Sequence, residues 1–131
     1  MDKVYEFLKK SGTYYLATTD GERPHNRPMG SINMFDGKLY FSTGKSKDMT
    51  KQIHANPNVE ISAFIEDTWL RLSCTLVEST DPNAVDSLLE SYPFLRPAYD
   101  TAKEGLLFCI TNATATFFPF NRPGDPEIVK F

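Results

Sequence analysis

The sequence holds little of what marks several large protein classes. Its 131 residues include two cysteines, Cys74 and Cys109, and two histidines, with no CxxC motif and no Cys/His cluster. This scarcity argues against a disulfide-rich secreted scaffold and against a structural zinc site. We therefore expect two reduced core cysteines, no bound metal and a cytoplasmic protein.

Long apolar runs are also absent. No segment approaches the length of a membrane span, and the N-terminal MDKVYEFLKKSG lacks the apolar core of a signal peptide, so no membrane partner is expected. The chain has 14 basic and 17 acidic residues, a net charge of -3. This balance argues against a nucleic-acid partner, because such proteins present a basic stripe.

Aromatic side chains, by contrast, are plentiful. Phe, Tyr and Trp make up 13% of the chain. They could fill a small β core, or they could offer flat surfaces to a planar ligand or a second subunit, and composition leaves both open. The length predicts one domain, residues 1–131, large enough for a core of its own but small enough to gain from a partner subunit.

Periodicity and turn signals predict a mainly β fold. Asp20-Gly21 and Asp36-Gly37 mark two hairpin turns, and Asp81-Pro82 is a cap followed by a proline at the first helical position. We expect about six strands, at residues 13–19, 24–35, 38–43, 59–65, 69–79 and 106–120, and short helices at residues 2–10, 48–55 and 82–92. Short antiparallel connections favour a small closed or split barrel over a parallel sheet.

A polar corner is predicted within residues 23–57. A strand ends in Ser42-Thr43-Gly44, and Lys47 and Lys51 lie one helical turn apart at the start of the next helix. Backbone N–H groups, hydroxyls and ammonium groups would meet there, as in an anion site, most often for phosphate. A solvated, lysine-rich helix cap remains the alternative. A Walker A loop is excluded, because Leu39 stands where that motif needs a glycine.

Two further groups of residues could serve the same ligand. Arg27 supplies a cation, Pro28 fixes the local backbone and Gly30 permits close approach. Trp69 and Arg71 share one face of a predicted strand. An indole and a guanidinium there could frame a planar ligand, or they could simply stack on each other at the surface.

Catalytic side chains cannot be assigned from the sequence. It contains no legible Ser/His/Asp or Cys/His arrangement and no distinctive carboxylate pair, which leaves hydrolase chemistry without support. His25 lies beside the polar corner and is a candidate proton donor, whereas His54 is expected at the surface.

Several segments follow one another with characteristic spacing. They are Ala17-Thr18-Thr19-Asp20-Gly21, Pro24, Arg27-Pro28-Met29, Asp36-Gly37-Lys38-Leu39-Tyr40-Phe41, Thr43, Lys47, Lys51-Gln52-Ile53, Asn56-Pro57-Asn58-Val59 and Trp69-Leu70-Arg71-Leu72-Ser73. This ordered set, which spans nearly the whole chain, resembles the pyridoxamine 5'-phosphate oxidase-like, FMN-binding split-barrel family, and within it the short nitroimidazole-reductase-like branch.

The resemblance implies a six-stranded antiparallel Greek-key split barrel that forms a homodimer with FMN in grooves at the interface. By position, the FMN phosphate and ribityl chain would be held by Arg27, Lys47, Lys51 and Gln52, with contacts from Ser42 and Thr43. Pro28, Met29 and Gly30 would run along the isoalloxazine ring, and Trp69 and Arg71 would lie near it.

The sequence also departs from the family pattern. Cys74 stands where the family usually has glycine, and the loop from Thr43 to Lys47 lacks the Ser-Arg-Lys run of the true pyridoxamine-phosphate oxidases. Their substrate-binding C-terminal segment is not recognisable in residues 116–131, so vitamin B6 oxidation is not expected.

The expected function is that of an FMN-dependent oxidoreductase acting on a small molecule. One alternative is a flavin-binding carrier or sensor without turnover. Another is reuse of the fold for a deazaflavin or for haem, which would need His25 or His54 as its axial ligand.

Overall fold

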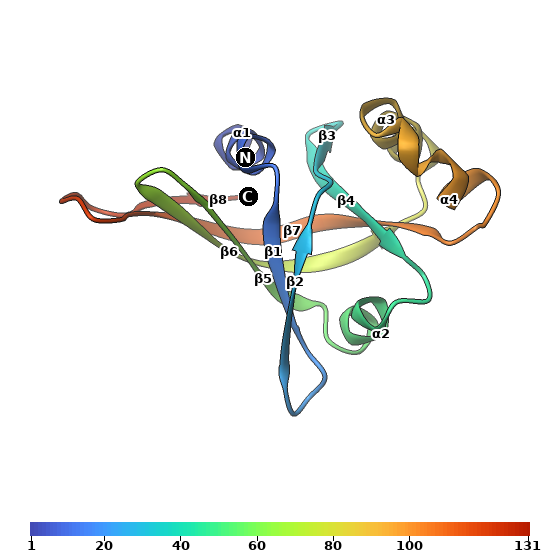
Figure 1. Ribbon diagram of the computed structural model, residues 1–131, viewed down its shortest axis with the longest axis horizontal. Coiled ribbons are helices and arrows are strands. Elements are labelled where there is room, and N and C mark those ends of the chain that lie inside the picture. The colour runs from blue at the N-terminus through green and yellow to red at the C-terminus, as the bar shows by residue number, and fades with distance from the viewer.

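Two long neighbouring strands, β6 (Thr68–Ser79) and β7 (Gly105–Pro119), form the spine of the fold (Figure 1). The computed structural model describes every residue, Met1–Phe131. β7 pairs with three strands. β6 lies along most of one edge, and β4 (Lys38–Gly44) and β8 (Glu127–Lys130) share the other edge. The left-handed residue Asn112, with φ of 48°, separates the part of β7 that pairs with β4 from the part that pairs with β8.

The other strands extend the sheet on both sides of this spine. The order is β2-β1-β5-β6-β7-β4-β3, and every pairing is antiparallel. The remaining bounds are β1 Tyr14–Thr19, β2 Pro24–Met29, β3 Asn33–Phe35 and β5 Asn58–Ile65. The sheet therefore has two limbs, β2-β1-β5 and β4-β3, whose outer strands β2 and β3 do not pair with each other, so the barrel is split.

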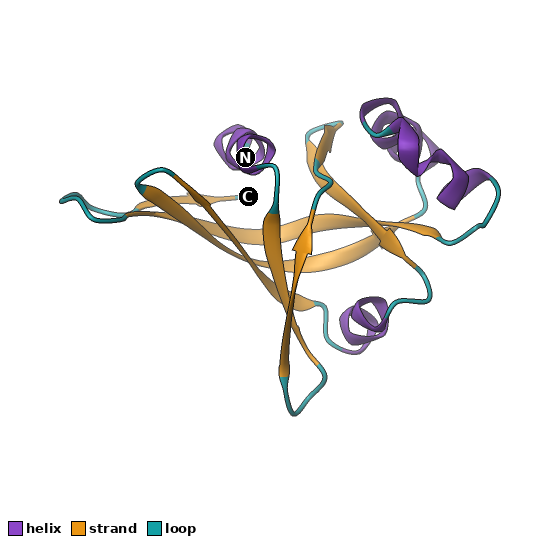
Figure 2. Cartoon of the chain, in the orientation of Figure 1, coloured by secondary structure: helices purple, strands orange, loops and turns teal.

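Short helices lie around this sheet (Figure 2). They are α1 (Asp2–Ser11), α2 (Asp48–Ala55), α3 (Pro82–Ser91), α4 (Arg96–Asp100) and the 3-10 helix η1 (Pro93–Leu95). The predicted cap of α3 is present, since the Asp81 side chain accepts a hydrogen bond from the Asn83 N–H and Pro82 is the first helical residue. None of these helices has the length and apolarity needed to cross a membrane.

Alternation along the strands directs one set of side chains into a common core. On β6 the buried side chains are Leu70, Leu72, Cys74 and Leu76, as predicted, and Arg71 between them is exposed. The core comprises 23 buried residues and takes Val4 and Leu8 from α1 and Met49 and Ile53 from α2. A smaller cluster lies beneath α3, which covers the opposite face of β4 and β7, so both faces of this part of β7 are apolar.

The predicted mainly β split-barrel class is confirmed, and both cysteines are free and buried. The element count differs, because the structure has eight strands where about six were expected. The segment predicted as one strand over residues 24–35 is two strands, β2 and β3, and β8 lies in what was expected to be a turn-rich tail. Residues 93–100, expected only to end α3, form η1 and α4.

The break between β2 and β3 is held by tyrosine hydroxyls. The fully buried Tyr14 donates to the Ser31 carbonyl at 2.6 Å. The Tyr92 hydroxyl, from just beyond α3, accepts from the Ile32 N–H and donates to the Ile32 carbonyl. These bonds replace ladder pairing over residues 30–32, so the chain can leave one limb of the sheet and enter the other.

Tyr14→Phe should lower the free energy of unfolding at neutral pH by about 1–3 kcal/mol, because it leaves the Ser31 carbonyl buried without its donor. Burial also raises the pKa of Tyr14 well above its usual value. The stabilising contribution of the neutral hydroxyl is therefore complete below the unfolded-state pKa of about 10 and shrinks as the pH rises from there toward the folded-state pKa.

Urea unfolding of both proteins at several pH values measures this difference, which should narrow above pH ~10. The matched control is Tyr15→Phe, because Tyr15 is 45% exposed and its hydroxyl makes no hydrogen bond within the protein. Equal losses for the two variants would contradict the role given to Tyr14.

Candidate functional site

Helix α2 crosses from one limb of the sheet to the other and carries two of the predicted site residues, with a third, Lys47, at its N-cap. It follows β4 and precedes β5, which lie in different limbs. Its buried face holds Met49, Thr50 and Ile53, and the Thr50 hydroxyl donates to the Gly44 carbonyl at 2.5 Å. This anchoring fixes the start of the helix, where Lys47 is the N-cap residue, and leaves Lys51 exposed and Gln52 half-buried.

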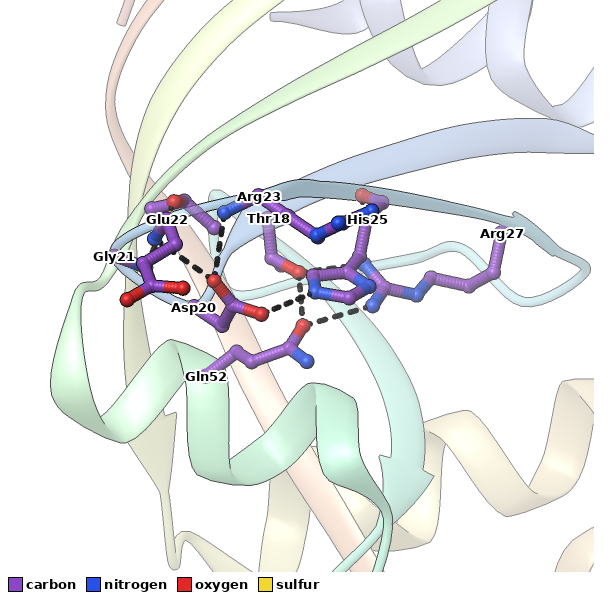
Figure 3. A network of polar contacts seen from close by, with 9 residues as sticks. Thr18, Asp20, Gly21, Glu22, Arg23, His25, Arg27 and Gln52 are labelled. Carbon is purple, nitrogen blue, oxygen red and sulfur yellow. Dashed lines mark hydrogen bonds and ion pairs between the residues drawn. The ribbon is translucent and has the colours of Figure 1, made fainter.

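Arg27 and Gln52 are brought together, with Thr18 between them (Figure 3). The Arg27 guanidinium donates to the Thr18 hydroxyl at 2.8 Å, to the Gln52 Oε1 at 3.0 Å and to the Leu16 carbonyl at 3.2 Å. The Thr18 hydroxyl in turn donates to the same Gln52 oxygen at 2.5 Å. Strands β1 and β2 and helix α2 thus meet in one polar network.

The charge of Arg27 has no counterion within the chain. Its acceptors are hydroxyl, amide and carbonyl oxygens, and no carboxylate lies within ion-pair distance. Partial burial lowers the pKa of Arg27 from its usual value, because desolvation disfavours the charged form. The Arg27 Nε and the Gln52 Nε2 have no acceptor in the protein and remain available to a ligand.

The other end of α2 borders a second polar pocket. Lys47, Ser42, Thr43 and Gly44 line a hollow of about 220 Å³ together with residues that follow α3. The Ser42 hydroxyl shares a hydrogen bond with the Tyr99 hydroxyl at 2.7 Å. The Thr43 hydroxyl is buried and has no hydrogen-bond partner. Every other buried side-chain nitrogen or oxygen of the protein has a partner. Such a group costs stability unless a ligand satisfies it.

The loop before α2 does not present its backbone N–H groups as the sequence suggested. The N–H of Lys45 donates to the Glu104 carbonyl, that of Ser46 to the Glu104 carboxylate, and that of Lys47 to the Gly44 carbonyl. These donors are therefore already satisfied. The side chains of Lys47 and Lys51, which form no ion pairs, carry the free positive charge of this region.

The segment from Pro28 to Gly30 lies at the end of β2. Pro28 is exposed, and Met29 is buried in the main core. Gly30 is exposed, and a Cβ added there would meet no atom within 4 Å, so the surroundings within the chain do not require glycine at this position. Open space beside Gly30 is compatible with the close approach predicted for it.

Trp69 and Arg71 lie on the opposite face of the sheet from Arg27. Residues paired across neighbouring strands share a face of the sheet. Arg71 is linked in this way to Pro28, through Ser62 and Tyr15, and these four lie on the outer face. Arg27 pairs with Leu16, which lies on the core side. Trp69 stacks on Phe118 at 4.4 Å, and the Arg71 Cζ lies 5.1 Å from the Trp69 ring centroid. The expected indole–guanidinium pair is present, but away from the Arg27 network.

Both histidines are paired with carboxylates. His25 contacts Asp20 at 2.8 Å within the β1–β2 hairpin, and His54 contacts Glu78 at 2.8 Å. His54 is exposed, as expected. No group of three His, Cys, Asp or Glu side chains lies close enough to hold a metal ion.

The largest hollow on the surface, about 620 Å³, lies between Lys38, Val77 and Asn112. It contains none of the predicted site residues, and its lining of mixed charges and apolar groups favours no particular chemistry.

Sequence reasoning missed two residues of this region. Thr18 contacts the predicted site residue Arg27 from the neighbouring strand, and Glu104 lines the pocket of Lys47 from beyond α3. The alternation in β1 could have placed Thr18 on the core side, where a buried hydroxyl needs a partner. No local signal marks Glu104, because 58 residues separate it from its contact Ser46.

Comparison with known proteins identifies relatives of the chain. A family described as pyridoxamine 5'-phosphate oxidase matches residues 1–115. Among curated proteins, none matches this chain. A NimC/NimA family protein from Clostridium acetobutylicum superposes with a TM-score of 0.91 at 30% identity, covering 100% of this chain and 93% of that one.

Two more distant structures share the fold. General Stress Protein 26 from Bacillus anthracis has a TM-score of 0.75 at 20% identity, covering 99% of this chain and 97% of that one. A haem-binding protein from Mycobacterium smegmatis has a TM-score of 0.73 at 10% identity, covering 96% of this chain and 56% of that one. The match over residues 1–115 and the full-length likeness at 30% identity agree with the split barrel and its ordered motifs. The chain belongs to the pyridoxamine 5'-phosphate oxidase family.

Proposed function

We propose that this protein binds FMN, with the phosphate and ribityl chain held around α2, and acts as an oxidoreductase on a small molecule. The observation that carries the proposal is the half-buried guanidinium of Arg27, which has no carboxylate partner. A half-buried charge lowers the stability of the fold unless an anion neutralises it. Lys47 and Lys51 add two unpaired cations on the adjoining helix.

The residues present fit the group. Phosphate needs cations and hydrogen-bond donors, which Arg27, Lys47 and Lys51 supply, and the polyol chain of FMN needs partners such as the free amide donor of Gln52. Thr43, whose buried hydroxyl has no partner, lines the same pocket as Lys47. Ser42, Pro28, Met29 and Gly30 complete the proposed site, with Trp69 and Arg71 on the outer face of the sheet.

The double variant Arg27→Gln/Lys47→Gln should weaken FMN binding by about 100-fold or more, because each charge-assisted contact to phosphate contributes about 1.5–3 kcal/mol. Riboflavin, which lacks the phosphate, should lose much less affinity. Quenching of flavin fluorescence on titration measures both ligands.

The control for this experiment, Arg23→Gln/Lys10→Gln, removes two exposed cations that make no side-chain contact. It should bind FMN as the unaltered protein does. An FMN affinity that stays within about twofold in the Arg27/Lys47 variant would refute the proposed phosphate site.

Thr43→Val should change the stability of the protein and its affinity for FMN in opposite directions. Replacing the unpartnered hydroxyl with a methyl group removes a buried, unsatisfied polar group, so the free energy of unfolding should rise by about 1 kcal/mol, while FMN affinity should fall. Chemical unfolding and flavin titration give the two quantities.

The matched control is Thr50→Val, at a buried threonine whose hydroxyl does donate a bond, to Gly44. That variant should lose stability. If Thr43→Val were also destabilising and bound FMN normally, the Thr43 hydroxyl would have no part in the site.

The outer face of the sheet supports a homodimer. Phe64 is 53% exposed and Phe120 45% exposed, and their rings meet at 5.2 Å beside the stacked Trp69 and Phe118. A continuous aromatic surface of this kind is unusual on a protein that stays monomeric. A second copy covering it would also bring Trp69 and Arg71 to a groove between the two chains.

Light scattering should accordingly give a mass of about twice the 14.8 kDa of one chain. Phe64→Glu places a charge in the aromatic surface and should yield monomers. Phe94→Glu, at a side chain that is 77% exposed on η1, should remain dimeric. A monomeric parent protein, or a dimer unaffected by Phe64→Glu, would argue against this interface.

FMN, when bound, supplies two-electron redox chemistry, and the protein contributes binding, orientation and exclusion of water. A second candidate is a flavin carrier or sensor without turnover. Anaerobic mixing with reduced nicotinamides distinguishes the two, since only an oxidoreductase would bleach the flavin and pass the electrons to an acceptor.

Haem fits the chain less well. The Nε2 atoms of His25 and His54 each face a carboxylate at 2.8 Å, so axial ligation through Nε2 would break an existing contact. An absorption spectrum of the purified protein separates FMN, deazaflavin and haem.

A further inference from the structure

Glu104 directs its carboxylate at the loop that joins β4 to α2. One carboxylate oxygen, Oε1, accepts hydrogen bonds from both the N–H and the hydroxyl of Ser46, each at 2.5 Å. The Glu104 carbonyl accepts from the Lys45 N–H at 2.8 Å, which fixes the backbone of Glu104 beside the loop. The bonds from Ser46, with smaller effects of Lys45 and Lys47, hold the pKa of Glu104 below its usual value.

This carboxylate lies beside Lys47, one of the residues proposed to hold the phosphate. Glu104 lines the same 220 Å³ pocket as Lys47, Ser42 and Gly44. The Glu104 Oε1 is 3.0 Å and the Lys47 Cε 3.5 Å from the point where a Cβ on Gly44 would stand, so the two side chains converge on one small region. Two donors from Ser46 and a nearby ammonium group are what an oxygen of a phosphate needs.

We propose that Glu104 is an internal competitor for the FMN phosphate. Its carboxylate uses the Ser46 donors and the positive potential of Lys47, so the phosphate must displace it and turn it toward solvent. Glu104 would thereby set the affinity for phosphorylated flavin and leave the affinity for an unphosphorylated one unchanged. This inference rests on the proposed function, because it assumes that the FMN phosphate binds beside Lys47.

The test compares Glu104→Gln with the unaltered protein, titrating each with FMN and with riboflavin. Glutamine keeps the length of the side chain and an oxygen that can accept from Ser46, but it removes the negative charge. FMN should bind about tenfold more tightly to the variant, while the affinity for riboflavin should stay within about twofold. Glu104→Ala, which removes both the charge and the acceptor, should also bind FMN more tightly.

The matched control is Glu90→Gln, which makes the same charge change at an exposed residue of α3 that has no side-chain contact, and it should bind FMN as the parent does. Thermal melts check that every variant is folded.

If the parent binds FMN and Glu104→Gln binds it equally or less tightly, the competitor role is wrong while the proposed function stands. If riboflavin gains as much as FMN does, the phosphate is not the group with which Glu104 competes. If the parent binds no FMN, the proposed function and this inference both fail.

Discussion

The arrangement of the whole molecule depends on one strand, β7, which pairs on one edge with β6 and divides its other edge between β4 and β8. This division keeps the two limbs of the sheet apart while they share one core. A chain that builds both limbs must cross the gap between them. It does so in the short turn at residues 30–32 and again through α2. The first crossing is secured by hydroxyl hydrogen bonds from the buried Tyr14 and the half-buried Tyr92, and the second by the apolar face of α2.

The polar site is a consequence of the second crossing. α2 buries Met49, Thr50 and Ile53, and its Gln52 meets the guanidinium of Arg27 on β2. Leaving Arg27 half-buried without a carboxylate has a cost in stability, as does burying the Thr43 hydroxyl without a partner. Such costs concentrate at functional sites, where a ligand offsets them. The two costly groups lie in the network and the pocket that adjoin α2.

The sequence predicted most of the strands because alternation and turn chemistry are local signals. Asp36-Gly37 does join two strands, and Leu70, Leu72 and Cys74 are buried as their spacing indicated. The break at residues 30–32 was not predictable in the same way, since it depends on Tyr92, which is 60 residues away from Ile32. Strand β8 was missed because it has only four residues and follows a segment rich in turn-forming residues. The predicted residues Arg27 and Gln52 do contact each other, but the carboxylate of Glu104, which reaches the loop from 58 residues away, has no signal in the local pattern.

The division of the proposed site between two faces of one sheet limits how a flavin could be held. Arg27 is on the core side and Arg71 on the outer side, and strand register leaves no freedom to change this, since a shift of one residue would exchange the buried and exposed sets along the whole strand. Phosphate contacts around α2 and ring contacts from Trp69 and Arg71 of the same chain are therefore hard to combine on one FMN. The proposed homodimer would remove the difficulty if the outer face of one protomer approached the α2 end of its partner. The proposed cofactor binding would then require dimer formation, and a monomeric form would retain the proposed phosphate end without the aromatic wall for the ring.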